Sequence, residues 1–153
     1  MILMGNPALH ITAVSGLITG PDDKVLLVLS PRRGWELPGG QLDEGETLIN
    51  ALTREVYEES GVMIQAGALA CIHHNLKSPP KLIYGFLGSW VSGELETSAE
   101  SIETEWVARD QVLDRISQPA MLERTRDMLE FSGRIVYRVY YTDPYIMVYQ
   151  EYI

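Results

Sequence analysis

The feature that most constrains this chain is a predicted helix with three glutamates on one face. Glu55, Glu58 and Glu59 are spaced i, i+3 and i+4 between Thr47 and Gly61, and residues at that spacing share one side of a helix. Three like charges so close together repel one another, so something positive is expected among them. A carboxylate cluster without basic partners is the ligand type that a hard divalent cation such as Mg²⁺ uses.

The same helix is also expected to carry an apolar stripe. At about 100° per residue, Ile49, Leu52 and Val56 lie roughly a quarter turn from the glutamates and can face a core. A solvated acidic face, the usual meaning of a charge run, is the alternative explanation of the glutamates.

The segment around this helix resembles the Nudix box, G-x5-E-x7-R-E-U-x-E-E-x-G-U, where U is a bulky aliphatic residue. The nine specified positions are all filled, by Gly40, Glu46, Arg54, Glu55, Val56, Glu58, Glu59, Gly61 and Val62. A pattern with this many fixed positions is far more specific than a lone glycine-rich loop. The match therefore outweighs the alternative of a solvated acidic face.

The resemblance implies a fold and a reaction. Nudix proteins are α/β/α sandwiches built on a mixed sheet, and they hydrolyse a nucleoside diphosphate linked to another group X with Mg²⁺ or Mn²⁺. By the same resemblance, the metal ligands are Glu55, Glu58 and Glu59 with the backbone carbonyl of Gly40. Arg54 is expected to pair with box glutamates, including Glu46, because a guanidinium fork suits a carboxylate.

The residues upstream of the box also resemble the family. An aromatic residue, Trp35, precedes the sequence Pro-Gly-Gly that leads into the box. Arg32 and Arg33 form the only adjacent basic pair in the chain, so they are candidates for contacting phosphate, with a solvated loop pair as the alternative. Gly39 is expected to let the backbone approach the metal or the phosphate closely, and a plain turn is the alternative there.

A further carboxylate is expected from a later loop. Glu100 lies where many relatives carry a glutamate proposed as the general base or as an extra metal ligand, and Glu103 is the second choice. General-base catalysis needs a carboxylate within hydrogen-bond reach of the attacking water. The alternative is that Glu100 is one more exposed acid in the acidic segment 94–105.

Length and charge bound the class of protein. The 153 residues suit one domain covering 1–153. The net charge of −9 argues against non-specific nucleic-acid binding, and an anionic substrate would need metal ions or a local basic patch. Cys71 is the only cysteine, which excludes an internal disulfide and suits a cytoplasmic location. No membrane span is expected, because no apolar run is long enough, and residues 1–7 are too few and too uncharged to be expected to act as a signal peptide.

The rest of the chain reads as an alternation of strands and helices. Strands 9–19 and 24–29 should pair as a hairpin, followed by an irregular loop at 31–40. A terminal hairpin, 133–152, is expected as an appendage to the sandwich that serves dimerisation or packs over the sheet. The remaining predictions are a helix at 47–60, strands at 62–75, 81–91 and 102–107, and helices at 109–116 and 119–131.

The sequence therefore predicts a metal-dependent pyrophosphohydrolase acting on a small nucleotide-type substrate, with a homodimer as a candidate assembly. Three alternatives stay open: an RNA 5′-end pyrophosphohydrolase, which the net charge disfavours; a nucleotide-sensing module that does not cleave; and a prenyl diphosphate isomerase. The intact box favours catalysis over sensing. Cys71 is a poor candidate for the cysteine that an isomerase needs. The group X is not fixed by the sequence.

Overall fold

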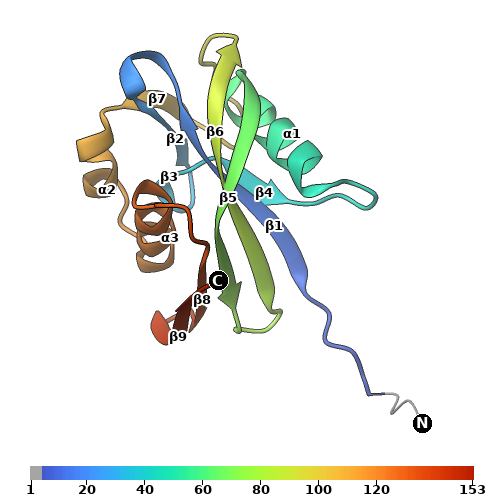
Figure 1. Cartoon of the computed structure of the whole chain (residues 1–153). Helices are drawn as coiled ribbons and strands as arrows, with labels where there is room; N and C mark the ends of the chain where they lie inside the picture. Colours follow the sequence, from blue (N-terminus) through green and yellow to red (C-terminus); the bar gives the residue numbers. More distant parts are fainter. Residues whose placement is uncertain (1–4) are drawn as a thin grey trace.

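The computed structural model describes residues 5–153, which form a mixed sheet flanked by helices (Figure 1). The strand order is β3-β2-β1-β6-β5-β8-β9, with β4 paired to β1 and β7 paired to β2. The strands are β1 Ile11–Thr19, β2 Val25–Ser30, β3 Gly34–Glu36, β4 Gly39–Gln41, β5 Met63–Asn75, β6 Lys81–Ser92, β7 Glu103–Val107, β8 Val136–Tyr141 and β9 Ile146–Tyr152.

Helices cover both faces of the sheet. Helix α1, Leu48–Ser60, lies on one face, while α2, Val112–Arg115, and α3, Pro119–Leu129, lie on the other (Figure 1). Two single turns of 3-10 helix, Pro21–Asp23 and Arg109–Gln111, join neighbouring elements. This arrangement is the α/β/α sandwich that the sequence predicted.

The alternation of side chains along β2 explains why there are two cores. Val25 and Leu27 belong to the cluster beneath α2 and α3, whereas Leu26 and Val28 belong to the cluster beneath α1. All four are fully buried. A strand with both faces covered is expected to be apolar at every position, as the run Val-Leu-Leu-Val is.

Several predicted elements differ from the observed ones. The hairpin of β1 and β2 is limited to the pair Thr19 and Val25, because β1 turns away to pair with β4 and β6. The loop at 31–40 contains the short strands β3 and β4. Only one α-helical turn forms within the helix predicted at 109–116. On α1, Leu52 and Val56 are buried as expected, but Ile49 is 42% exposed and does not face the core.

The two strands of the terminal hairpin have different environments. Strand β8 runs parallel to β5, and its Val136, Val139 and Tyr140 are buried. Strand β9 is the last strand in the order, and all seven of its residues are exposed. The hairpin therefore extends the main sheet through β8, and only β9 is peripheral to it.

A buried polar cluster fastens β8 to α3 and β5. Arg138 donates from Nε and Nη2 to the two carboxylate oxygens of Asp127, at 3.0 and 2.8 Å, and His73 Nε2 lies 2.8 Å from Asp127 Oδ2. Burial lowers the pKa of His73 to about 4 in spite of this carboxylate. Asp127 therefore carries the charge that balances Arg138 inside the protein.

Asp127→Asn should destabilise the fold by about 3 kcal/mol or more, because it leaves the buried Arg138 guanidinium without its counter-charge. Urea unfolding followed by circular dichroism measures the change. Glu123→Gln is the matched control: Glu123 also faces Arg138, at 3.8 Å, but is more exposed, and its loss should cost less than about 1 kcal/mol. Equal losses in the two variants would contradict this account of Asp127.

Candidate functional site

Helix α1 is fixed at both ends, which sets the direction of its glutamates. Thr47 is the N-cap, and its side-chain oxygen accepts a hydrogen bond from the Asn50 backbone N–H at 3.1 Å. Gly61 ends the helix with φ +79°, a left-handed conformation that favours glycine. Ala51, Leu52 and Val56 are fully buried against the sheet, so rotation of α1 about its axis is prevented.

Three carboxylates meet beside the first residues of β4. Glu55 and Glu59 come from α1, and Glu100 comes from the loop between β6 and β7; one oxygen from each lies within 4.8 Å of the others. Glu55 and Glu59 are buried, whereas Glu100 is exposed. The cluster thus combines two buried carboxylates with one that is open to solvent.

Glu58, the third glutamate of the helix, lies outside this cluster. Its side chain is 53% exposed, and Arg54 Nη1 approaches its Oε2 at 3.3 Å. Glu103, the second choice for a later carboxylate, lies on β7 beside Trp35 and Arg115, in a different surface depression. Of the two downstream candidates, the fold brings Glu100 to the helix and leaves Glu103 elsewhere.

Arg54 connects the helix to the loop before it. Its Nε and Nη2 donate to the two oxygens of Glu46, both at 2.7 Å, and Nη2 also donates to the Gln41 carbonyl at 3.0 Å. Its Nη1 donates to Glu55 Oε1 at 2.9 Å. Hydrogen bonding to Arg54 lowers the pKa of Glu46 to about 2. The guanidinium therefore orders the loop and orients one carboxylate of the cluster.

The two glycines of β4 allow the strand to fit between β1 and α1. A β-carbon on Gly39 would lie 2.1 Å from the Val14 carbonyl oxygen, and one on Gly40 would lie 2.5 Å from the Glu55 carboxyl carbon. The backbone N–H of Gly39 donates to Glu59 Oε1 at 3.1 Å. Close backbone approach is thus a property of both positions, and they form a strand rather than a plain turn.

Burial and mutual repulsion raise the pKa values of two carboxylates of the cluster, Glu55 and Glu59. Burial raises the pKa of Glu59 to about 8, and the charges of Glu55, Glu36 and Glu100 add to the effect. The pKa of Glu55 is also raised, mainly by burial, although Arg54 opposes the shift. Carboxylates that are costly to ionise in this way form a site where a cation would be favoured.

The comparisons with known proteins agree with this geometry. The family model described as "NUDIX domain" matches residues 9–130. The chain belongs to the Nudix family. A "MutT-like protein" from Streptomyces ambofaciens is 31% identical over 130 residues, which cover 84% of this chain and 82% of that protein. Members of this kind are pyrophosphohydrolases, and this chain is one of them.

Two further comparisons extend this result. The human "8-oxo-dGDP phosphatase NUDT18" is 33% identical over 63% of this chain, but the match spans only 32% of that protein. A MutT protein from Bacillus halodurans has a solved structure that superimposes with a TM-score of 0.75, at 21% identity, covering 93% of this chain and 97% of that one. Among residues 5–153, the structure contains no helix long and apolar enough to cross a membrane.

The residues upstream of the Nudix box have separate environments. Arg33 donates to both oxygens of Glu36, at 2.9 and 2.8 Å. Arg32 is exposed and lines the pocket that also contains Glu55 and Glu100. Trp35 is held beneath Arg115, whose guanidinium carbon lies 5.3 Å from the ring centroid. The fold thus places Arg32 and Arg33 near the carboxylates and Trp35 in a neighbouring depression.

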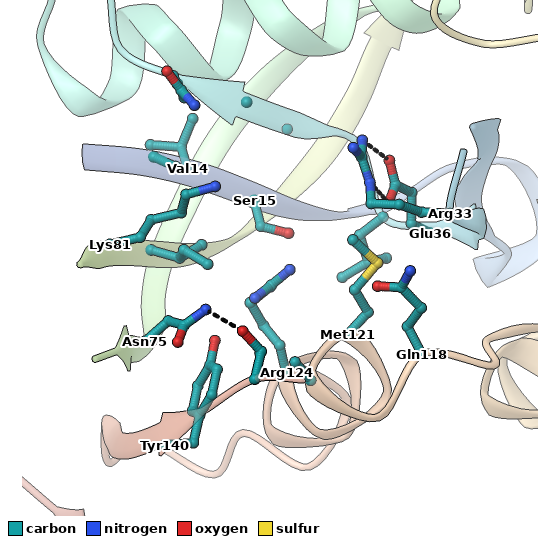
Figure 2. Close-up of a pocket in the computed structure, with 18 residues that line it drawn as sticks. Val14, Ser15, Arg33, Glu36, Asn75, Lys81, Gln118, Met121, Arg124 and Tyr140 are labelled. Atoms are coloured by element: carbon teal, nitrogen blue, oxygen red, sulfur yellow. Dashed lines mark hydrogen bonds and ion pairs between the residues drawn. The ribbon is translucent and has the colours of Figure 1, made fainter. Parts of the chain in front are cut away.

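A second pocket beside the box was not predicted from the sequence. It lies between β1, β6 and α3, and its polar lining includes Asn75, Lys81, Gln118 and Arg124 (Figure 2). Lys81 and Arg124 are isolated basic residues on a predicted strand and a predicted helix. Only the pairing of β1 with β6 and the packing of α3 bring them together.

The stability of the metal-free protein should fall as pH rises from about 4.5 to 8. In that window folded Glu59 holds a proton that the unfolded chain has lost, because its pKa is raised to about 8, so the free energy of unfolding decreases with pH. Glu59→Gln removes this titration and should reduce the decline by up to about 1.4 kcal/mol per pH unit. Urea unfolding in EDTA at several pH values measures it.

Glu130→Gln is the control for this series, because Glu130 is exposed and outside the cluster. In this variant the free energy of unfolding should decline with pH as it does in the wild-type protein. A Glu59→Gln variant with the same decline would show that Glu59 is not the titrating group.

Proposed function

We propose that this enzyme hydrolyses the pyrophosphate bond of a nucleoside diphosphate linked to a group X, with Mg²⁺ or Mn²⁺ as cofactor. The observation that carries the proposal is the meeting of Glu55, Glu59 and Glu100 beside the Gly39–Gly40 backbone, where Glu55 and Glu100 line one pocket. Pyrophosphate is anionic, so carboxylates alone would repel it. A cation between them reconciles the site with the substrate.

The residues present fit such a cation. All the donors are oxygens, the preference of a hard divalent ion. The cation would be held by the Gly40 carbonyl and by Glu55, Glu58 and Glu59. The side chain of Glu58 is half exposed and would have to turn from Arg54 towards the cation. A bound divalent cation would neutralise phosphate oxygens and lower the pKa of water. The raised pKa values of Glu55 and Glu59 support their role, because a cation favours the ionised forms.

The protein's own residues would position the remaining groups. Glu100 is exposed on a loop at the edge of the cluster, and as general base it would accept a proton from the attacking water. The oxygen of that water bonds to one phosphorus atom, and the bridging oxygen leaves with the other phosphoryl group. Arg32, which faces the same pocket, is suited to contact phosphate oxygens. Arg33 can do so while remaining paired with Glu36.

Small nucleotides are the substrate class that the relatives support. The human relative is described as acting on 8-oxo-dGDP, a modified nucleoside diphosphate. The net charge of −9 disfavours an RNA 5′ end. A sensing module would bind the same ligands without turnover. One screen therefore separates the three possibilities, which are a small nucleotide substrate, an RNA 5′ end and sensing without turnover. The screen measures the phosphate products released from nucleoside triphosphates, oxidised nucleotides, ADP-ribose, sugar nucleotides and capped RNA.

Hydrolysis should require Mg²⁺ or Mn²⁺ and stop in EDTA. Glu59→Gln and Glu58→Gln should each lower kcat by about 100-fold or more, because each removes a ligand charge whose effect is realised in the transition state. Glu130→Gln should leave kcat unchanged. Turnover in metal-free buffer would contradict metal dependence, and wild-type kcat in Glu58→Gln at saturating Mg²⁺ would remove Glu58 from the ligand set.

We also propose that β9 pairs with β9 of a second copy. The strand is at the edge of the sheet, where backbone donors and acceptors are free to pair. Its large apolar side chains are about half exposed, as in Ile146 at 54%, Val148 at 54% and Tyr149 at 46%. An antiparallel copy related by a two-fold axis would present the same strand and cover the same side chains.

Val148→Lys should convert a dimer into a monomer, because it would place a charged lysine on each of the two paired edge strands. Light scattering after size-exclusion chromatography measures the mass. Val91→Lys is the control, since Val91 is equally apolar and 60% exposed but lies on β6, and it should remain dimeric. A monomeric wild-type protein would contradict the proposal.

A further inference from the structure

The pocket between β1, β6 and α3 adjoins the pocket of the carboxylate site. It has a volume of about 340 Å³, and it shares Arg33, Gly39, Gly40 and Gln41 with the pocket that contains Glu55 and Glu100. Strand β4 is thus the common wall. A substrate whose pyrophosphate lies against the glycines would place one of its ends in the second pocket.

This second pocket is basic, in contrast to the chain as a whole. Its lining contains three cationic side chains, Arg33, Lys81 and Arg124, and one carboxylate, Glu36. Glu36 is engaged by Arg33 through two hydrogen bonds. Within residues 5–153, neither Lys81 nor Arg124 has a carboxylate within 4 Å, whereas most other arginines of the protein are ion-paired. Two positive charges are therefore available to a ligand.

The two side chains converge from different elements. In Figure 2, Lys81 extends from β6 and Arg124 rises from α3, and both point towards the middle of the pocket beside Ser15. Neither residue is fully exposed. The pKa of Lys81 is lowered first by burial and then by the charges of Arg124 and Arg33. This like-charge repulsion is a cost that a bound anion would relieve.

The start of α3 lines the same pocket. Pro119 occupies the first turn, and Gln118, Ala120 and Met121 line the cavity. The first N–H groups of an α-helix have no partner within the helix, and they attract anions together with the helix dipole. No side chain caps this end of α3. The helix terminus thus reinforces the two cations.

We propose that this pocket binds a phosphate monoester carried by the substrate, in addition to the pyrophosphate that is cleaved. The inference rests on the proposed function, since the substrate must cross β4 to reach both pockets. A phosphate monoester carries nearly two negative charges at neutral pH, which matches Lys81 and Arg124. The monoester could be on the nucleoside ribose or on the group X, and both sources share this chemistry.

The pocket can be tested without any turnover, using inorganic phosphate as the probe. In EDTA, phosphate should cause saturable shifts of the ¹H–¹⁵N resonances of Ser15, Gln118 and Met121. Lys81→Met and Arg124→Met should each weaken binding by about tenfold or more, as expected for the loss of a charged hydrogen bond. Lys24→Met and Arg134→Met, on exposed residues elsewhere, should not.

The source of the phosphate is tested by calorimetry with three ligands in EDTA. These are ADP-ribose, ADP-ribose phosphorylated on the adenosine ribose, and ADP-ribose phosphorylated on the terminal ribose. One phosphorylated compound should bind more tightly than ADP-ribose, by about tenfold or more. The ratio of the two affinities should fall towards one in Lys81→Met and stay unchanged in Lys24→Met. The preferred compound identifies the end of the substrate that enters the pocket.

Two results would overturn the inference: absence of saturable phosphate shifts in the pocket, or equal affinity for the three ligands. Either can occur while Mg²⁺-dependent hydrolysis of unphosphorylated substrates persists. Conversely, phosphate binding that depends on Lys81 and Arg124 without hydrolysis of any nucleotide would reject the proposed function and retain the site.

Discussion

The contacts of Arg54 hold together the parts on which the candidate active site depends. One guanidinium bonds both oxygens of Glu46, the Gln41 carbonyl at the end of β4, and the carboxylate of Glu55. It therefore ties a loop, a strand and a helix at the place where they meet. Lysine could supply the charge but not the planar set of donors. Without this fork, Glu55 would have no fixed orientation towards the rest of the cluster.

The protein separates its charges in a way that suits an anionic substrate. Acidic groups gather at α1, where they would need a cation, and unpaired basic groups lie on the other side of β4. The net charge of −9 alone would repel a nucleotide. Local fields, rather than the overall charge, therefore have to bind the substrate. The short distance across a single strand allows both fields to act on one molecule.

The sequence predicted the parts of the site that are local along the chain. The helix and the pairing of Arg54 with Glu46 both depend on spacings within about twenty residues, so a motif can encode them. Glu58 shows a limit of helical periodicity: it shares a face with Glu55, but Arg54 holds it outside the cluster. Periodicity also failed for Ile49, because the sheet covers only the side of α1 that carries Ala51, Leu52 and Val56.

Non-local contacts explain what could not be predicted. Lys81 and Arg124 are 43 positions apart in the sequence, and they meet only because β1 pairs in parallel with β6 while α3 packs across the same face. No local pattern distinguishes these two residues from ordinary surface charges. Likewise, β8 looks like half of an isolated hairpin until its parallel pairing with β5 and the Asp127–Arg138 contact are known.

The two pockets also differ in how freely their residues could change. On the carboxylate side, a β-carbon at Gly40 would collide with Glu55 and one at Gly39 with β1, so backbone and side chains constrain one another. On the basic side, Lys81 and Arg124 extend from β6 and α3 as long side chains that take part in no ion pair of the described structure. Replacing them would alter the charge of the pocket without disturbing α1. The residues of the carboxylate side and of the basic side of β4 can therefore change independently, and the constraints on residue choice are weaker on the basic side.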